Sequence, residues 1–532
     1  MKTKRATLTA LYLLSGTSHA SWSPPPDYAL YTSDNGHFFQ LSNGSPFFWQ
    51  ADTAWTLMAR LNYTETETYL ADRASKGFNV VEAIGPSFSG LDGANRQGDL
   101  AFINMDVHQP NEAYWNHVDS VVELAWKRHG IRIALFPAWG NYVHNSENIA
   151  GPLNTSNAGI LGEFIGKRYP YLPKILFGDI NPTWQNKTQV KEEYAAGGVP
   201  SKYETVDWLP VYNALAEGII RGERAAVRNS TASAKYTPLI SLHNQNQWFD
   251  GAPLALASSE AGHRDWLTFD IAQSGHSDYP PNPPIHWWNC RRGYETVELM
   301  YAVGERWPGK KRPALDNEPH YEGRYNNARG WLPSWNASDV RVGTWQTVFS
   351  GAAGAVYGAD MVWQMYNPAF YESNGGGPAL PWYEAIKLPG SKQIQFVKKA
   401  ILDRGNSSFL DRVPASEIIV GNAGTSKFPL KRQAKLQVGL FEIQGVNDKK
   451  IKALRDSKGS WIMVYTPTGK QFSIDTKDIE GCDVKARWYD PLSGDYTSIK
   501  YAQCESNSTI KEFAPPKTDD HDDWTLVLEK DD

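Results

Sequence analysis

Short apolar runs alternate with longer stretches of helical periodicity through residues 45–365. Eight of these runs have the length and composition of buried strands. They lie at Phe47–Ala51, Phe78–Ile84, Ile131–Phe136, Ile175–Phe177, Pro238–Leu242, Leu267–Ala272, Pro313–Leu315 and Ala353–Tyr357. The intervening stretches carry apolar residues at helical spacing, as in Glu112–His129, which Gly130 ends. This alternation predicts a (β/α)8 TIM barrel rather than an open, doubly wound sheet.

The pattern changes after the barrel. Trp382–Arg404 is predicted to be one last helix, and Gly405–Ser408 reads as a linker. Only strand-like runs separated by turn residues follow, which indicates a small antiparallel β-sandwich. These runs are Glu417–Val420, Leu436–Glu442, Trp461–Tyr465, Val484–Tyr489 and Trp524–Leu528. We therefore predict a barrel domain over residues 21–404 and a β-sandwich domain over residues 405–532.

The first twenty residues have the pattern of a secretory signal peptide. Lys2, Lys4 and Arg5 precede an apolar run that is too short to span a bilayer, and Ser18–Ala20 is a small-x-small cleavage site. Asn-x-Ser/Thr sequons agree with export, and they occur at Asn43, Asn62, Asn154, Asn186, Asn229, Asn336, Asn406 and Asn507. We expect a secreted, extracellular glycoprotein with no membrane anchor.

Three cysteines are present. Cys482 and Cys504 could close a loop in an oxidising compartment, or could be two separate core residues. Cys290 is then unpaired, and no Cys/His cluster has the spacing of a zinc site. We predict no metal and no cofactor.

Composition and motifs exclude several classes of protein. The net charge of −5 and the pI near 6.2 come with no basic patch for nucleic acid. The chain has no Gly-x-Ser-x-Gly elbow, no His-Glu-x-x-His and no Gly-x-Gly-x-x-Gly, which argues against a serine hydrolase, a zinc protease and a nucleotide enzyme. The 21 Trp and 26 Tyr residues suit stacking against sugar rings. We expect a monomer that binds carbohydrate.

Two of the predicted barrel strands lead to carboxylates. Asp179 closes Lys174–Asp179 and Glu318 closes Pro313–Glu318. Active sites of such barrels form at the C-terminal ends of the strands, and two carboxylates there are the groups that glycoside hydrolysis requires. The structural alternatives are that Glu318 pairs with Arg324 and that Asp179 caps a turn.

Other strand ends supply candidate substrate-binding residues. They are Asp52, Trp55, Trp139, His243, Gln273, His276, Asp316, Tyr321 and Trp363. Asp52 could equally cap the following turn, and His276 could be a core histidine. Asp316 precedes Glu318 by two residues, so an ideal strand would place both on one side, where Asp316 could assist Glu318.

Several motifs together resemble the apiosidase-like glycoside hydrolases. The matching stretches are Pro46–Trp55, Tyr69–Asn79, Phe177–Asp179, Gln273–His276 and Asp316–Glu322, with Tyr465–Gly469, Trp488–Pro491 and Asp523–Leu528 in the tail. The resemblance implies a (β/α)8 domain followed by a β-domain named for collagen binding. It also implies release of apiose from pectin side chains, with Asp179 as acid/base and Glu318 as nucleophile of a retaining mechanism.

One departure qualifies this resemblance. The large clan of retaining barrel glycosidases has Asn-Glu at the end of strand four, where this chain has Gly178-Asp179. The side chain of Asp is one methylene shorter than that of Glu, so its carboxyl group lies at a different place. The sequence therefore supports the pair of carboxylates more strongly than it supports the retaining mechanism. The alternative function is a non-catalytic carbohydrate- or matrix-binding protein on a barrel scaffold.

Overall fold

The computed structural model describes most of the chain after residue 21. The described ranges are 22–185, 205–228, 236–246, 256–276, 293–306, 311–326, 333–424, 449–504, 508–518 and 521–531, together with the backbone of 432–436 and 439–443. The predicted signal peptide, Cys290 and the sequons at Asn186, Asn229 and Asn507 lie outside the described residues.

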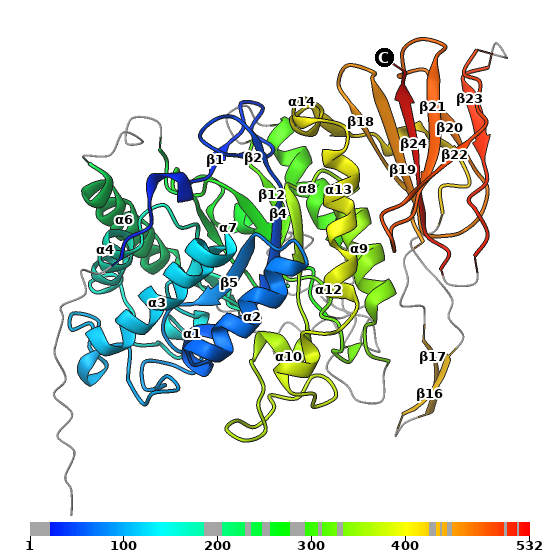
Figure 1. The fold of residues 1–532 in the computed structure, drawn as a ribbon. Helices are drawn as coiled ribbons and strands as arrows, with labels where there is room; N and C mark the ends of the chain where they lie inside the picture. Colours follow the sequence, from blue (N-terminus) through cyan, green and yellow to red (C-terminus); the bar gives the residue numbers. More distant parts are fainter. Residues whose placement is uncertain are drawn as a thin grey trace, which may run out of the picture.

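Eight parallel strands form the centre of the larger domain (Figure 1). They are β4 (Trp49–Thr53), β5 (Val80–Ile84), β6 (Arg132–Phe136), β7 (Lys174–Leu176), β10 (Ile240–Leu242), β11 (Asp270–Ala272), β12 (Ala314–Asp316) and β13 (Gly354–Tyr357). Six pair in the order β10-β7-β6-β5-β4-β13, and β11 pairs with β12. Thr268 N donates to Ile240 O at 3.0 Å, and Ala353 N donates to Ala314 O at 2.8 Å. These two bonds join β11 and β12 to the ends of the six-stranded sheet, so the predicted barrel is confirmed.

Helices surround the barrel where the sequence predicts them. They are α2 (Tyr63–Ser75), α3 (Glu112–His129), α4 (Ala158–Arg168), α6 (Leu209–Val227), α8 (Gly293–Arg306) and α9 (Ala337–Phe349). Their ends follow local chemistry: Asn62 and Glu65 form a capping box at the start of α2, and Gly130 ends α3 with a φ of 63°. None of the described helices is long and apolar enough to cross a membrane.

The stretch Trp382–Arg404 differs from its prediction as a single helix. It contains three short helices, α11 (Trp382–Ala385), α12 (Gly390–Gln393) and α13 (Gln395–Leu402). Pro389 precedes α12 and has no backbone N–H to continue a helix, and its ring disfavours helical geometry at the residue before it. The apolar face of α13 is nevertheless buried through Val397, Ala400 and Ile401.

The C-terminal strands form two antiparallel sheets. One has the order β14-β18-β19-β24-β21-β22 and the other the order β15-β20-β23. The ranges are β14 (Arg412–Pro414), β15 (Ile419–Gly421), β18 (Lys452–Asp456), β19 (Trp461–Thr466), β20 (Phe472–Asp475), β21 (Val484–Tyr489), β22 (Tyr496–Ile499), β23 (Ile510–Phe513) and β24 (Trp524–Lys530). Apolar side chains from both sheets share one core, including Phe472 and Phe513 from the smaller sheet and Leu526 from the larger. This is the predicted β-sandwich.

The predicted strand Leu436–Glu442 is divided in the structure. Its residues belong to β16 (Arg432–Leu436) and β17 (Gly439–Ile443), which pair antiparallel, with Leu436 opposite Gly439. The predicted single strand is therefore two strands, whose backbone groups hydrogen-bond to each other.

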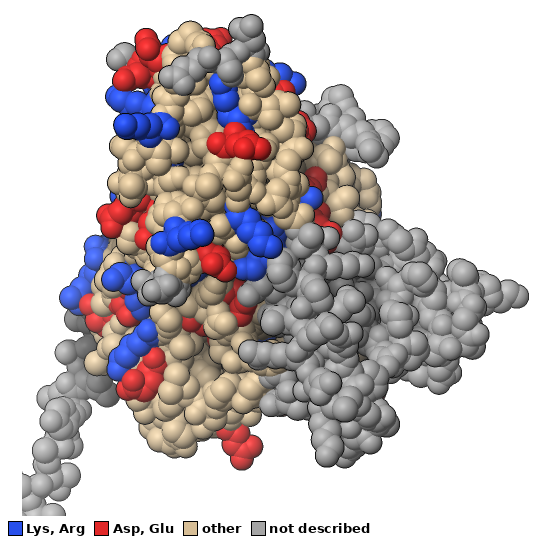
Figure 2. All heavy atoms as spheres, turned by 90° about the vertical axis from the view of Figure 1, so that its right-hand side faces the viewer, with Lys and Arg blue, Asp and Glu red and all other residues tan. Residues whose placement is uncertain are grey.

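The larger sheet of the sandwich packs on the barrel domain through α9 and α13 (Figure 1). Trp345 and Phe349 of α9 lie against Tyr465 of β19, with ring centroids 5.3 and 6.2 Å away. A buried ion pair crosses the same contact, with Arg341 Nη2 2.7 Å from Asp523 Oδ1. On the face of the molecule seen in Figure 2, basic and acidic side chains are interspersed over the described surface.

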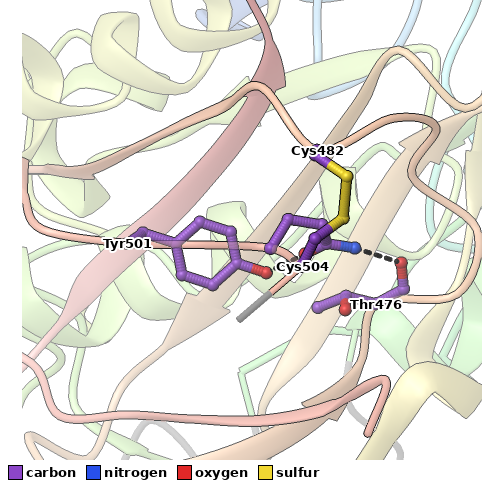
Figure 3. Close-up of a disulfide and its surroundings, with 5 residues drawn as sticks. Thr476, Cys482, Tyr501 and Cys504 are labelled. Carbon is purple, nitrogen blue, oxygen red and sulfur yellow. Dashed lines mark hydrogen bonds between the residues drawn. A yellow bond between two sulfur atoms is a disulfide. The ribbon is translucent and has the colours of Figure 1, made fainter. Parts of the chain in front are cut away.

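Cys482 and Cys504 are joined in a disulfide (Figure 3). Their Cα atoms lie 5.3 Å apart. Gln503, next to Cys504, donates from Nε2 to the backbone oxygen of Thr476 at 3.3 Å. Of the two alternatives left open by the sequence, the structure supports the closed loop.

Candidate active site

Asp179 and Glu318 come together at the C-terminal mouth of the barrel. Asp179 follows β7 by three residues, and Glu318 follows β12 by two. One carboxyl oxygen of Asp179, one of Glu318 and one ring nitrogen of His243 all lie within 4.8 Å of one another. Glu318 is buried, whereas Asp179 is partly exposed. The two predicted catalytic carboxylates therefore face each other across a short gap.

Two histidines hold the Glu318 carboxylate. His276 Nε2 lies 2.8 Å from Oε1, and His243 Nε2 lies 3.2 Å from Oε2. Burial by itself would raise the pKa of Glu318, but the contacts with His243 and His276 outweigh burial and hold this pKa well below its usual range. Burial also lowers the pKa of His276 to about 4, so near neutral pH its ring is uncharged and donates its single N–H to Glu318.

Asp179 has the opposite electrostatic environment. Removal from water raises its pKa to about 6, and the charge of Glu318 acts in the same direction. Gln273 Nε2 donates to Asp179 Oδ1 at 3.0 Å and fixes the orientation of the carboxyl group. The backbone of Asp179 has a φ of 57°, which is uncommon for a residue with a side chain and is typical of functional sites.

Aromatic side chains form one wall beside this pair. Trp55 lies edge-on to Trp139 with centroids 5.0 Å apart, and its ring centroid is 5.6 Å from that of His243. Phe88 contacts both Trp139 and Trp363, at 5.1 and 5.7 Å. Such a wall can stack against the apolar face of a sugar ring.

Tyr321 lies on the side of His276, with ring centroids 4.3 Å apart. Its side chain is buried, and the charges of Glu318 and Asp179 add to the burial that raises the pKa of its hydroxyl well above the usual range. Tyr321 is therefore a neutral hydroxyl beside the two carboxylates.

Two predicted substrate ligands lie elsewhere. Asp52 is fully buried against the outer helix α2, where Arg73 Nε lies 2.8 Å from Oδ2 and Tyr69 Oη donates at 2.5 Å. Side chains alternate across a strand, so Asp52 and Gln50 point to the same side. Gln50 Nε2 donates to the backbone oxygen of Lys76, the residue that follows α2, and this side is therefore the outside of the barrel. We assign Asp52 a structural role in place of the predicted contact with sugar.

Asp316 also faces away from the barrel mouth. Its carboxylate accepts from Ser274 N at 3.1 Å and from Ser274 Oγ at 2.8 Å, and it lies against Gly293 at the start of α8. The regular strand ends at Asp316 and the chain bends at Glu318, so the two carboxylates do not share a side. Asp316 therefore does not assist Glu318 by direct contact.

Sequence reasoning missed Phe88, Glu82 and Asn317. Phe88 follows β5 in a Ser-Phe-Ser context that carries no distinctive signal. Glu82 stands in an otherwise apolar strand run, which is itself a signal that the sequence analysis did not use. Asn317 Nδ2 donates to Glu82 Oε2 at 2.9 Å.

Within the described residues, the group that could hold a metal ion is Asp179, His243 and Glu318. Carboxylate oxygen and imidazole nitrogen are ligands that several divalent cations accept. The same three side chains are also arranged for acid/base and nucleophilic chemistry on a sugar.

Comparison with known proteins fits this geometry. Residues 33–406 match the family model of the apiosidase-like catalytic domain. The chain belongs to the apiosidase-like family. Residues 437–529 match a model named for a collagen-binding domain of a collagenase. No curated protein matches the chain.

Solved structures show the same fold. A glycoside hydrolase is 22% identical, with 96% of this chain and 99% of that chain covered and a TM-score of 0.72. A glycoside hydrolase family 5 protein from Bacteroides vulgatus ATCC 8482 is 23% identical, with 96% and 95% covered and a TM-score of 0.73. This apiosidase-like protein is therefore a glycoside hydrolase built on a barrel, and its substrate is a carbohydrate.

Proposed function

We propose that this protein is a secreted, retaining glycosidase that releases apiose from pectin-type side chains. The family supports the sugar, and the geometry of Asp179 and Glu318 supports the mechanism.

Glu318 acts as the nucleophile. Its carboxylate attacks the anomeric carbon while Asp179 gives its proton to the leaving glycosidic oxygen, so a covalent glycosyl-enzyme forms and the aglycone departs as an alcohol. Asp179, now ionised, takes a proton from water, and the resulting hydroxide attacks the same carbon and releases Glu318. The second displacement restores the original configuration.

The short gap between the carboxyl groups carries this proposal. Retaining enzymes hold the two groups about 5–5.5 Å apart, whereas inverting enzymes need roughly 6.5–9.5 Å to admit a water. Oxygens of Asp179 and Glu318 within 4.8 Å fit the shorter class. The pKa of Asp179 is raised and that of Glu318 is lowered, and this separation assigns the acid and the nucleophile.

Secretion is supported by independent features. Five sequon asparagines fall within the described residues; Asn43, Asn154, Asn336 and Asn406 are exposed and Asn62 is partly buried. A disulfide between Cys482 and Cys504 suits an oxidising compartment. Mass spectrometry of the protein from culture medium would test cleavage after Ala20 and sequon occupancy, and light scattering would test the expected monomer.

Active-site variants test the mechanism. Glu318→Ala should abolish turnover of pectin-type substrates and aryl glycosides, and azide should partly restore it by forming a glycosyl azide. Asp179→Ala should reduce hydrolysis of poor leaving groups far more than that of activated aryl glycosides, since protonation matters less for the latter. Glu322→Gln is the matched control, because Glu322 is a buried carboxylate held by Tyr357 Oη and Gly390 N outside the pair.

The outcomes are separable. Wild-type turnover by Glu318→Ala would overturn the assignment of the nucleophile. Proton NMR of the first-formed sugar should show retained configuration, and an inverted product would overturn the retaining mechanism alone. Lack of turnover on a broad panel, with retained binding to insoluble polymer, would overturn the proposed activity as a whole.

A further inference from the structure

A hydrogen bond between Glu82 and Asn317 crosses the interior of the barrel. Glu82 lies on β5 and Asn317 directly follows β12, and these strands are not neighbours in the sheet. Asn317 Nδ2 donates to Glu82 Oε2 at 2.9 Å, and both side chains are fully buried. Asn317 N also donates to Ala272 O at 2.7 Å. Asn317 immediately precedes Glu318, so this bond ties the catalytic end of β12 to the opposite wall.

Each side chain of this pair also has a buried oxygen outside the bond, namely Oε1 of Glu82 and Oδ1 of Asn317. Within the described part of the chain, neither Glu82 Oε1 nor Asn317 Oδ1 has a hydrogen-bond partner. An amide oxygen and an ionised carboxylate oxygen are both acceptors, so they cannot satisfy each other. Leaving either oxygen unsatisfied carries a free-energy cost, because a buried acceptor has lost its hydrogen bonds to water. One proton on Glu82 removes both costs, because the acid then donates to Asn317 Oδ1 while its other oxygen accepts from Nδ2.

The electrostatic surroundings favour that proton. Burial raises the pKa of Glu82 well above its usual range, and the carboxyl groups of Glu318 and Asp52 raise it further. The nearby Trp49 indole, whose N–H makes no hydrogen bond within the described residues, and the Asn317 amide both lower this pKa, but they do not outweigh burial. The charge of Glu82 would also act on Tyr321, but burial keeps the Tyr321 hydroxyl neutral. A neutral Glu82 adds no second negative charge beside the nucleophile.

We propose that Glu82 is a positioning residue, held protonated and paired through both carboxyl oxygens with the Asn317 amide, so that the end of β12 presents Glu318 in a fixed orientation. The link to Glu318 rests on the proposed function, in which Glu318 is the nucleophile. The acid–amide pair itself does not rest on it.

Two substitutions of similar size separate positioning from space filling. Glu82→Gln keeps a two-bond pair, because its amide N–H donates to Asn317 Oδ1 and its oxygen accepts from Nδ2. Glu82→Leu removes both bonds. On the nitrophenyl glycoside that the wild-type enzyme hydrolyses fastest, Glu82→Gln should keep kcat and the pH profile of the wild type. Glu82→Leu should lose roughly 100-fold in kcat with little change in KM, the scale of an approximately 1 Å misplacement.

Melting curves establish that both variants fold. Equal kcat for folded Glu82→Leu and Glu82→Gln would overturn the positioning role, because filling space would then suffice. A folded Glu82→Gln as inactive as Glu82→Leu would also overturn it, because the reaction would then need an ionisable group at residue 82.

Infrared difference spectroscopy tests the pair without any substrate. The spectrum of the wild type minus that of Glu82→Gln, near neutral pH, should contain one carbonyl band of a protonated carboxyl group. A carboxylate band in its place would overturn the protonated pair. The spectrum tests the protonated pair independently of the glycosidase activity. If no glycoside is hydrolysed, the proposed function fails, and the spectrum still shows whether Glu82 is protonated.

Discussion

The indole ring of Trp139 lies directly against the backbone of Gly178. A Cβ at residue 178 would come within 2.2 Å of the ring atoms Cη2 and Cζ3 of Trp139, a distance that no real contact allows. Gly140 N also donates to Gly178 O at 3.1 Å, so the segments after β6 and β7 are packed backbone to backbone. The Trp139 ring therefore occupies the space that an asparagine side chain would need at residue 178, which accounts for the glycine at this position.

We predict that Gly178→Ala displaces Trp139 and Asp179 together and lowers kcat/KM by roughly 100-fold, because small misplacements of a catalytic acid carry costs of that order. Steady-state kinetics on an aryl glycoside would measure this. Gly343→Ala is the matched control, since a Cβ there meets nothing within 4 Å and should leave kcat/KM unchanged. Full activity of Gly178→Ala would show that Trp139 can move without consequence.

The raised pKa of Asp179 predicts the alkaline limit of activity. Asp179 must be protonated to act as the acid, and its pKa is about 6, so kcat/KM for substrates with poor leaving groups should fall as pH rises through about 6. In Asp179→Ala the same limb should disappear for activated aryl glycosides. A pH profile of kcat/KM checks both, and an alkaline limb that survives in Asp179→Ala would assign it to another group.

The contacts of His243 and His276 with Glu318 predict where activity falls at low pH. His276→Ala removes the hydrogen bond to Glu318 Oε1, and His243→Ala removes the ring nitrogen that lies 3.2 Å from Oε2. A hydrogen bond to a charged acceptor is worth about 1.5–3 kcal/mol. The pKa of Glu318 should therefore rise by about one to two units, and the acid limb of kcat/KM should move upward by the same amount. His129→Ala is the control, because His129 contacts Glu67 at the end of α3 and lies outside the site. An unchanged acid limb in both variants would contradict this account of the lowered pKa.

The C-terminal domain should stabilise the barrel domain. Deleting the chain from Asn406 would expose Trp345 and Phe349 to water. The lost burial should cost about 1.5–3 kcal/mol of folding free energy for each large apolar side chain. We expect lower solubility and a lower melting temperature for the truncated protein. A truncated barrel that remains fully stable and loses only polymer binding would make the domain an independent binding module.

The buried pair Arg341–Asp523 should contribute to this docking. Arg341→Ala removes one of the two cations beside the buried Asp523, the other being His521, and should destabilise the protein by up to about 3–5 kcal/mol in urea unfolding. The folded-state pKa of Asp523 is depressed by Arg341 and His521 in spite of burial, so its stabilisation is present at neutral pH and is lost as pH falls through that folded-state value. Lys387→Ala, which breaks the exposed pair with Glu384, should change stability by less than about 1 kcal/mol.

The sequence by itself determined most of the elements and placed the two candidate carboxylates at the barrel mouth. Apolar runs such as Ile131–Phe136 are strands because burial on both faces requires continuous apolar side chains. Helix ends such as Asn62 and Gly130 follow local chemistry. Asp179 and Glu318 were found because parallel strands of a barrel all end at one mouth.

Only the tertiary structure decided which polar residues face that mouth. Asp52 and His243 both end barrel strands, yet Asp52 pairs with Arg73 outside the barrel while His243 lies 3.2 Å from Glu318. Alternation along β12 would send Glu318 outward with Asp316, but the regular strand ends at Asp316 and a bend at Glu318 directs this side chain toward Asp179 and His243. Where a strand stops depends on backbone pairing with neighbours far away in sequence, and no local pattern specifies that.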